Sequence, residues 1–558
     1  MTSPADTSPF NPTLDRIASR GDYDRLRQSF RWHCPEYFNF GCDVVDRWAR
    51  EVPDRVAMHW VSGREERAVT FGQLAERTDR LARALLQLGL NRGDRVLVIL
   101  PRIIPWWETL VAALKAGLVA MPATTLLTPR DIAYRLQLSE ASAVVCDAEG
   151  AEKIDTVPGG CPTLRRRILV AEKPRAGWDT YEDLIAAAPS GRQLPKTRSS
   201  DPALVYFTSG TTGMPKMVLH THASYGLGHE VTGRLWLDLR GDDLHWNISD
   251  TGWAKAAWSS LFGPWSCGAG LFVHYTPGRF QPADVLQCLR DHPITTLCAA
   301  PTIYRHLVQL DLREFRAQAL RHCVAAGEPL NPEVIATWKR ATGLTVRDGY
   351  GQTETVLLCA NFPGVDVKPG AMGLPSPGFE LAIVNEHGHP LPPGQEGDIA
   401  VRVEPQRPLG MFREYWRDAD ATARSLRNGW YVTGDCGRVD DDGYFWFVGR
   451  ADDVITSSAY RIGPFEVESA LIEHPAVVEA AVVGKPDPLR GEIVKAFVVL
   501  AVGYAASEDL KGELQEHVKR TTAPYKYPRE IEFVEDLPKT VSGKIRRVEL
   551  RQRSAKKG

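Results

Sequence analysis

The sequence predicts an α/β protein whose large N-terminal region is followed by a small α+β C-terminal domain. An amphipathic helical pattern over residues 70–90 is followed at once by the β-branched run DRVLVIL (94–100), the order of a βα unit. The same alternation returns from 290 to 350, whereas residues from about 378 to 448 are rich in Gly, Pro and alternating strand patterns. We therefore expect two βα-layered sheets, a small β-rich subdomain and a compact α+β C-terminal module.

The boundaries follow from changes in composition along the chain. Residues 1–40 form an N-terminal extension, 41–451 the large domain and 452–558 the small C-terminal domain. The first twelve residues lack the apolar core of a signal peptide and the Arg-rich pattern of a transit peptide. No apolar run is long enough to span a membrane.

Composition excludes some classes of partner. The chain has 558 residues, a formal net charge of -2 and 24% charged residues, so neither a basic nucleic-acid groove nor a basic membrane surface is indicated. Its ten cysteines include no CxxC pair, which argues against a zinc cluster or a disulfide framework. We expect reduced thiols and a cytoplasmic location; the oligomeric state, including a homo-oligomer, stays open.

The most informative segment is YFTSGTTGMPKMVLHTH (206–222), in which a short strand opens into a Gly/Thr-rich turn. Its glycines let backbone N–H groups approach phosphate, and hydroxyls and a lysine add donors and charge. The residues expected to hold ATP phosphates are Thr208, Ser209, Gly210, Thr211, Thr212, Gly213 and Lys216. The spacing is not that of a Walker loop. A plain glycine-rich hairpin would explain the glycines but not the hydroxyls and the lysine together.

This segment resembles the phosphate loop of the adenylate-forming enzymes, the superfamily of acyl-CoA synthetases, luciferases and peptide-synthetase adenylation domains. Four further segments appear in that family's order: GYGQTET (349–355), YVTGDCG (431–437), GRADDVITSSAYRIGPFEVESAL (449–471) and LPKTVSGKIRR (537–547). The contexts WNISDTGWAKAAWSS (246–260) and AAGEPLNPEV (325–334) are similar to the medium-chain acyl-CoA synthetases in particular.

The resemblance implies that a carboxylate attacks the α-phosphate of ATP and that the acyl-adenylate passes its acyl group to coenzyme A. Such chemistry needs control of charge more than a nucleophilic side chain. By resemblance, Asp435 holds the ribose with Arg450 nearby, Tyr350 stacks on adenine, Thr353 meets the α-phosphate and Glu354 helps to hold Mg2+. The other residues implied at the nucleotide are Gly327, Glu328, Pro329, Asp348, Gly349, Gly351 and Gln352. Taken singly, Asp435 could close a turn, Glu354 could cap a helix and Tyr350 could be core.

The C-terminal segments resemble the family's moving parts. Lys544 is implied as the catalytic ammonium that bridges the substrate carboxylate and the α-phosphate, although a basic tail is commonly just solvated. Asp452 resembles the hinge about which the small domain rotates before thioester formation. Residues implied on the acyl and CoA side are Ser458, Ala459, Tyr460, Arg461 and Arg490. Relatives commonly carry glycine at position 459 and arginine at position 436, where this chain has alanine and cysteine.

The acid is expected to be larger than acetate. Gly351 occupies the place where acetate-specific relatives resemble one another in carrying a tryptophan, so we expect room for medium-chain or benzoate-like acids. Trp253, and with it Trp258, would wall this pocket or else be ordinary core. His220 and His245 are expected to be structural rather than catalytic.

Three other functions stay open at this stage. An acyl-AMP ligase that loads a carrier-protein thiol would share the adenylation chemistry, but no carrier domain follows in this sequence. A non-catalytic nucleotide sensor should have lost residues such as Lys544, Asp435 or Glu354, and all three are present. A Rossmann oxidoreductase would need GxGxxG after a strand, which is not found.

Overall fold

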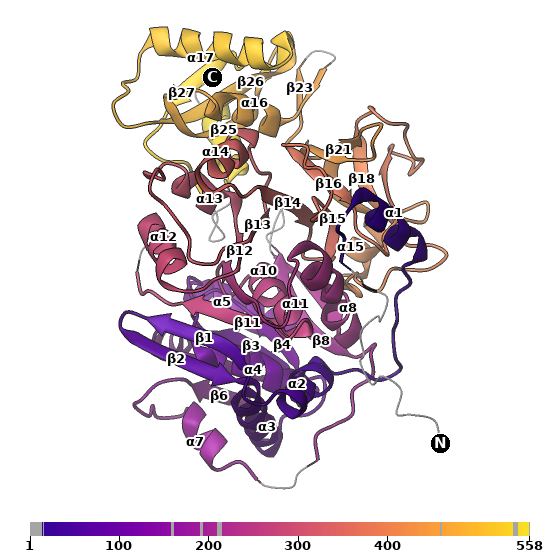
Figure 1. Cartoon of the computed structure of the whole chain (residues 1–558), viewed down its shortest axis with the longest axis vertical. Coiled ribbons are helices and arrows are strands. Elements are labelled where there is room, and N and C mark those ends of the chain that lie inside the picture. Colours follow the sequence, from indigo (N-terminus) through magenta and orange to yellow (C-terminus); the bar gives the residue numbers. More distant parts are fainter. Residues whose placement is uncertain are drawn as a thin grey trace.

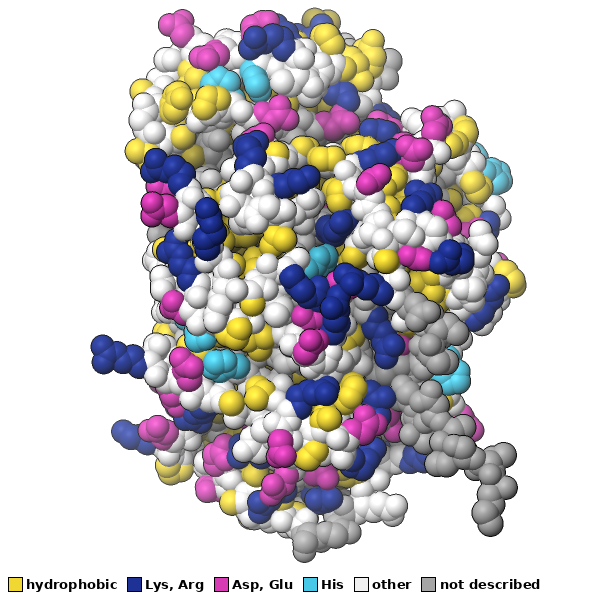
Figure 2. Space-filling model, in the orientation of Figure 1, with side chains coloured by type: hydrophobic (Ala, Val, Ile, Leu, Met, Phe, Trp, Pro, Cys, Tyr) yellow, Lys and Arg dark blue, Asp and Glu magenta, His cyan; other side chains and the backbone are white. Residues whose placement is uncertain are grey.

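The computed structural model describes residue 14 and residues 16–157, 161–189, 193–208, 215–278, 280–457, 460–539 and 545–556. Two large sheets with intervening helices make up the N-terminal region, and the small C-terminal domain lies at one end of the molecule (Figure 1). Acidic and basic side chains are interspersed on the face in Figure 2, in keeping with the near-neutral balance of charge. No helix of the described residues is both long and apolar enough to cross a membrane.

The larger sheet has 14 strands in the described part of the chain and is mostly parallel in its first half. β11, β10, β12, β13 and β14 run parallel side by side, and β1 joins them through β11. The strands of this half are β1 (Val56–Ser62), β2 (Glu65–Thr70), β10 (Leu244–Ile248), β11 (Gly270–His274), β12 (Thr296–Ala299), β13 (His322–Ala326) and β14 (Val346–Gly351). Its helices are α12 (Pro282–Asp291), α13 (Pro301–Leu307) and α14 (Pro332–Thr342).

The second half of this sheet is antiparallel and contains the expected β-rich region. Its strands are β15 (Leu357–Ala360), β16 (Ala371–Pro375), β17 (Leu381–Val384), β18 (Gly397–Arg402), β20 (Leu426–Arg427), β21 (Trp430–Val439) and β22 (Phe445–Arg450). Ala371 of β16 pairs with Trp446 of β22, so this region continues the main sheet instead of forming a detached subdomain. Helix α1 (Arg20–Ser29) packs on it, where the Tyr23 hydroxyl donates to the Pro375 carbonyl at 2.8 Å.

The second large sheet has eight strands among the described residues. They are β3 (Arg95–Ile99), β4 (Val119–Pro122), β5 (Ala143–Cys146), β6 (Arg166–Leu169), β7 (Asp179–Thr180), β8 (Pro202–Thr208), β9 (Lys216–Thr221) and β19 (Glu414–Tyr415). Helices associated with it include α3 (Phe71–Gln87), α4 (Ile104–Lys115), α5 (Pro129–Ser139), α6 (Ala148–Asp155) and α7 (Tyr181–Ala186). A buried core that includes Trp106, Trp107 and Leu110 of α4 joins this sheet to the first. The two sheets therefore share one apolar interior.

Helix α3 illustrates how the local sequence sets an element. Thr70 caps its N-terminus by accepting from the Gln73 N–H, and the Gln73 side chain accepts from the Thr70 N–H in return. The helix buries Phe71 and Leu85 among other apolar residues, and Gly89 with φ +84 follows its end.

The small domain is an α+β unit whose described part is built on a five-stranded sheet. Its elements are β23 (Ile455–Ser457), β24 (Tyr460–Ile462), α16 (Pro464–Ile472), β25 (Val477–Asp487), β26 (Gly491–Leu500), α17 (Glu508–Thr521), β27 (Glu530–Phe533) and α18 (Arg547–Lys556). The core of this domain contains Leu471, Val482, Val498 and Leu514. It touches the large region where Asn331 donates to Ser469 at 2.9 Å.

Candidate active site

The implied nucleotide residues gather where several strands end. Gly327 follows β13, Tyr350 ends β14 with Gly351, and Thr208 and Lys216 stand at the facing ends of β8 and β9. The carboxyl ends of parallel strands are where open α/β sheets commonly bind ligands. Residues 209–214, 458–459 and 540–544 lie outside the described part of the chain. The expectations for Ser209, Gly210, Thr211, Thr212, Gly213, Ser458, Ala459 and Lys544 therefore stay predictions.

Asp435 is the best-organised carboxylate of this region. It is 4% exposed and accepts hydrogen bonds from the Tyr350 hydroxyl and the Gln352 side-chain amide, both at 2.6 Å. Arg450, which pairs with it across β21 and β22, donates at 3.0 Å. A buried carboxylate needs such partners. The second and third implied segments thus meet at one group that can accept hydrogen bonds from a diol.

Tyr350 is held by its hydroxyl as well as by packing. Burial raises the pKa of its phenol well above the usual value, with the nearby Asp435 charge acting in the same direction. The phenol therefore stays a hydrogen-bond donor at neutral pH. Its ring orientation is fixed before any base arrives, which suits the stacking role that the resemblance implies.

A second cluster of polar side chains lies around Glu354. Its carboxylate accepts from the Tyr415 hydroxyl at 2.8 Å, and its carbonyl accepts from the Phe412 N–H at 2.7 Å. The Lys216 ammonium lies 4.8 Å from the centre of the Tyr415 ring. Burial raises the pKa of Glu354. Oxygen ligands of this kind suit Mg2+, and an adjacent cation would lower the pKa again.

Thr353 is positioned through its backbone by a buried histidine. The imidazole of His220 is completely buried, donates through Nε2 to the Thr353 carbonyl at 2.7 Å and contacts the Ser224 hydroxyl at 3.2 Å. Burial lowers the pKa of His220 to about 4, so the ring is neutral at pH 7. His245 is also buried, between the hydroxyls of Thr296 and Ser259. Both histidines have satisfied structural partners, as the sequence led us to expect.

The segment after β13 presents backbone rather than charge. Gly327 has φ +110, a conformation that favours glycine. The Glu328 carboxylate accepts from Arg305 at 2.9 Å and from the Thr302 N–H at 3.2 Å, and the Arg305 ion pair and these hydrogen bonds outweigh burial and lower its pKa. The side chain of Glu328 is thus fully committed, which leaves the backbone of Gly327 to Pro329 to face a ligand.

Asp348 differs from the other implied nucleotide residues. It is buried inside β14, and burial raises its pKa to about 8, while Lys255 acts in the opposite direction. The Asp348 carbonyl accepts from the Asn361 N–H at 2.9 Å. Its neighbour Gly349 has no room for a side chain, because a Cβ would lie 2.4 Å from the Trp236 ring. Asp348 and Gly349 therefore shape the wall of the expected nucleotide site and do not supply charge to it.

The small domain lies with the base of the lysine loop toward the large region. Lys539 and Ile545, on either side of the loop, form a β-bridge, and Lys539 donates to Glu479 at 2.8 Å. The half-buried Arg547 donates to Glu468 at 2.7 Å, and its pKa is raised chiefly by Glu468, with Glu328 of the large region also among the charges that raise it. The described flank of Lys544 therefore lies close to the segment that follows β13.

Asp452, implied as the hinge by the resemblance, lies near this contact. Asp452 is 3.9 Å from Arg450, and Asp453 pairs with Arg551. Tyr460 is 50% exposed and stacks on Tyr525 with ring centres 4.1 Å apart. Arg461 contacts the Cys436 sulfur at 3.5 Å. The exposed Arg490 N–H donates to Asp487 in a turn.

The acyl pocket is less simple than the sequence indicated. A Cβ on Gly351 would lie 2.5 Å from the Val356 carbonyl oxygen, so the missing side chain does not in itself leave room there. Trp258 is partly buried and stacks on His229 with ring centres 6.0 Å apart. Trp253 caps the short helix α10 (Ala254–Ala257). Both tryptophan side chains are partly exposed and so do not belong to the fully buried core.

Several residues that position the candidate site were not predicted from the sequence. Tyr415, Arg305 and Thr302 hold the implied residues from other segments, and no motif marks them. The sequence indicates a structural role for His220 but does not reveal its hydrogen bond to the Thr353 carbonyl. The only general clue is that buried polar groups need hydrogen-bond partners, and this rule does not say which residues supply them.

Comparison with known proteins identifies the relatives. The AMP-binding enzyme model matches residues 45–416, and the AMP-binding enzyme C-terminal domain model matches residues 466–544. The mitochondrial acyl-coenzyme A synthetase ACSM3 of Mus musculus is 52% identical over 95% of this chain and 93% of its own length. The mitochondrial acyl-coenzyme A synthetase ACSM4 of Rattus norvegicus is 51% identical over 93% of this chain and 90% of its own.

Solved structures agree with the fold. The anthranilate CoA ligase AuaEII in complex with anthranoyl-AMP superposes with a TM-score of 0.85 at 32% identity, covering 93% of this chain and 98% of that one. A benzoate CoA ligase from Burkholderia xenovorans gives a TM-score of 0.81 at 31% identity, covering 92% and 100%.

These relatives also correct one expectation. The curated relatives are named as mitochondrial proteins, so the prediction of a cytoplasmic location is wrong. The reason is that unpaired cysteines report only on a reducing environment, which does not specify a compartment.

Proposed function

The chain belongs to the AMP-binding enzyme family, in its medium-chain acyl-CoA synthetase branch, and from this premise we propose a complete reaction. A carboxylic acid and ATP form an acyl-adenylate and diphosphate, and CoA then takes the acyl group and releases AMP. The observation that carries the proposal is the buried Asp435, which is held by donors from two implied nucleotide segments.

The adenylation step depends on charge. Asp435 accepts from the ribose hydroxyls, Tyr350 stacks on the base and the carbonyl-anchored Thr353 meets the α-phosphate. Lys216 and Lys544 supply positive charge where negative charge accumulates as the carboxylate attacks phosphorus. No covalent enzyme intermediate is needed, because the acid itself is the nucleophile.

We assign the metal position to Glu354. Its oxygens are hard ligands of the kind that Mg2+ prefers, and one of them accepts from the Tyr415 hydroxyl at 2.8 Å. When bound, Mg2+ neutralises part of the phosphate charge and helps to orient the diphosphate leaving group. Tyr415 holds Glu354 in position for this role.

The thioester step uses the same cleft after a domain rotation. Rotation about Asp452 would withdraw Lys544 and bring the segment around Tyr460 and Arg461 toward the acyl-adenylate. Arg461 and Arg490 carry positive charge that suits the phosphates of CoA. In the present orientation Arg461 rests on Cys436, so this contact would break on rotation.

The acid is proposed to be a medium-chain fatty acid or a benzoate-like aromatic acid. The ligase structures similar to this chain are titled for anthranilate and benzoate, and the curated relatives are acyl-CoA synthetases. The partly buried Trp258, which stacks on the buried His229, is proposed as an apolar wall for such an acid. One methylene changes binding by only about 1–3 kcal/mol, so tolerance of chain length is expected.

One experiment tests both acid and acceptor. Straight-chain acids from C2 to C12 and benzoate are assayed for AMP release with and without CoA. We expect release that depends on medium-chain or aromatic acids and is stimulated by CoA. Release with acid but no stimulation by CoA would favour the alternative, an acyl-AMP ligase that loads a carrier-protein thiol. No AMP from any acid would overturn the proposal. Light scattering during gel filtration tests the homo-oligomer.

A further inference from the structure

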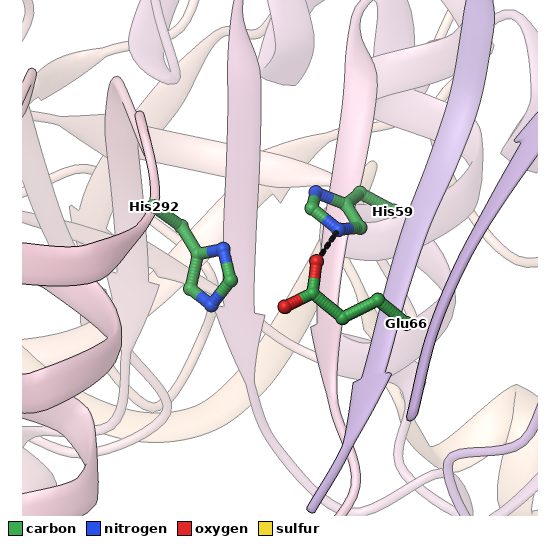
Figure 3. Close-up of side chains that lie close together, drawn as sticks. All are labelled: His59, Glu66 and His292. Atoms are coloured by element: carbon green, nitrogen blue, oxygen red, sulfur yellow. Dashed lines mark hydrogen bonds and ion pairs between the residues drawn. The ribbon is translucent and has the colours of Figure 1, made fainter. Parts of the chain in front are cut away.

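A group of metal-ligand side chains lies at the edge of the larger sheet, away from the nucleotide residues. His59 on β1, Glu66 on β2 and His292 directly after α12 come together there (Figure 3). His59 Nε2 and a Glu66 carboxylate oxygen are 2.9 Å apart. Each residue offers one ligand atom, and these atoms all lie within 4.8 Å of one another.

The backbone holds these three positions without help from a ligand. In the β1–β2 ladder His59 pairs with Ala68 and Val61 pairs with Glu66, so His59 and Glu66 project from the same face of the hairpin. Helix α12 packs on that face, because Val61 shares a core with residues of α12 such as Leu289. The three ligand positions therefore belong to three separately packed elements.

The imidazole rings are also restrained. The rings of His59 and His292 are 5.4 Å apart and nearly perpendicular, at 87°. His292 packs against Phe272 with ring centres 4.7 Å apart, and Phe272 is itself 1% exposed. Little side-chain freedom remains to be lost when an ion binds.

Two imidazoles and one carboxylate form a ligand set suited to zinc, which prefers nitrogen and oxygen ligands in tetrahedral geometry. Both His59 and His292 are half-buried and Glu66 is exposed, so solvent can supply the remaining ligand. We propose that His59, Glu66 and His292 bind one Zn2+ ion, which bridges the β1–β2 hairpin to the end of α12.

The site is distinct from the nucleotide cleft. β1 and β2 are the last strands at one margin of the sheet, whereas β13 and β14 lie well inside it (Figure 1). The ion therefore acts on the sheet edge and takes no part in acyl transfer. By joining an edge hairpin to a helix, it stabilises the native fold and not the unfolded chain. Besides Glu66 and His59, Asp291 is the other charge that acts on His292, and His292 in turn acts on His274.

The test is a zinc titration of chelator-treated full-length protein, measured by calorimetry in the presence of excess Mg2+. The titration is repeated with Co2+, whose binding is measured by visible absorption. Wild type should bind one ion tightly and gain thermal stability from it. His59→Ala and His292→Ala should each weaken binding about tenfold or more, which corresponds to about 1.4 kcal/mol or more. Glu66→Gln, which keeps the side-chain shape, should also weaken it. Acyl-CoA synthesis should be unchanged in all three.

The double variant His387→Ala/His389→Ala is the matched control, because these two surface histidines have ring centres 6.3 Å apart but lie on a different part of the chain. It should bind zinc as wild type does. Wild type without stoichiometric binding, equal affinity in His59→Ala/His292→Ala, or loss of binding in the control would each overturn the proposal.

Discussion

The phenol of Tyr350 donates a 2.6 Å hydrogen bond to the carboxylate of Asp435, a contact that joins residues 85 positions apart in sequence. Gln352 and Arg450 add two more donors to the same carboxylate. Three directed bonds hold the buried carboxylate of Asp435 in one orientation and supply the partners that a buried polar group needs. The carboxylate is therefore prepared to accept hydroxyls before the nucleotide binds.

Asp435→Asn should weaken ATP binding strongly. The amide keeps the shape but loses the charge and one acceptor, and hydrogen bonds to charged groups contribute about 1.5–3 kcal/mol each. We expect the KM for ATP to rise about 10- to 100-fold. Steady-state kinetics with varied ATP measures this. Tyr350→Phe, which keeps the carboxylate and the ring, should cost only a few-fold. An unchanged KM in Asp435→Asn would remove Asp435 from the nucleotide site.

Lys544→Ala should separate the two half-reactions. Acid-dependent exchange of diphosphate into ATP should fall about 100- to 1000-fold or more, the usual cost of losing one transition-state donor. Conversion of a supplied acyl-adenylate to its thioester should persist, because the small domain then presents a different face. Lys539→Ala is the control, since Lys539 flanks the same loop but pairs with Glu479. Equal loss of both half-reactions in Lys544→Ala would contradict the role.

Asp452→Pro should impair the opposite half-reaction. Proline fixes φ near -65° and also restricts the residue before it, so a hinge that needs a large backbone change is locked. Adenylation should be retained in larger part than thioester formation, as measured by separate single-turnover assays. Asp452→Ala removes the contact with Arg450 at 3.9 Å but leaves the backbone free, and should be nearly normal. A proline variant with normal thioester formation would place the hinge elsewhere.

The sequence predicted the elements whose signals are local. The helical pattern at 70–90 became Phe71–Gln87, because Thr70 and Gln73 form a capping box and Gly89 takes the left-handed conformation after it. The change in the order of helical and strand patterns beyond Arg450 likewise indicated a small C-terminal domain. These features depend on neighbours a few residues apart, which periodicity and capping residues reveal.

The sequence could not predict contacts between distant segments. Tyr415 holds Glu354 from 61 residues away. The continuity of the β-rich region with the main sheet depends on pairing of Ala371 with Trp446. The crowding beside Gly351 is of the same kind, because the group nearest to an added Cβ is the Val356 carbonyl, which is backbone and has no residue-type signature. Tertiary approach of this kind is invisible to pattern and composition.

Gly351→Ala is therefore expected to damage the enzyme instead of narrowing its acid range. A Cβ would lie 2.5 Å from the Val356 oxygen, so the backbone must shift, and overpacking of this kind typically costs about 1–3 kcal/mol. Activity should fall for all acids in similar proportion, and the thermal midpoint should drop. The acid panel and a melting curve measure both. A variant that loses only long acids would mean that the backbone yields and that Gly351 does line the acyl pocket.

Acid should destabilise the protein through its buried histidines. Burial lowers the pKa of His222 to about 4 from an unfolded value of about 6.5. Above pH 6.5 this residue is neutral in both states and has no effect. As the pH falls from 6.5 toward 4 the unfolded chain binds the proton first, so the free energy of unfolding declines, by about 3 kcal/mol for a shift of this size. Below pH 4 the loss is complete.

His222→Leu isolates this contribution, because both ring nitrogens of His222 are buried and have no hydrogen-bond partner among the residues that the structure describes. The variant loses no bond and should keep most of its stability at pH 7. Urea titrations of the variant and of wild type at pH 7, 6 and 5 should show a smaller decline in the variant. His220 and His322, whose pKa values are also lowered to about 4, remain in both proteins and set the common background. Identical pH dependence would mean that His222 is protonated in the folded state or reached by water, because only a lowered folded pKa makes the unfolded chain the better proton acceptor.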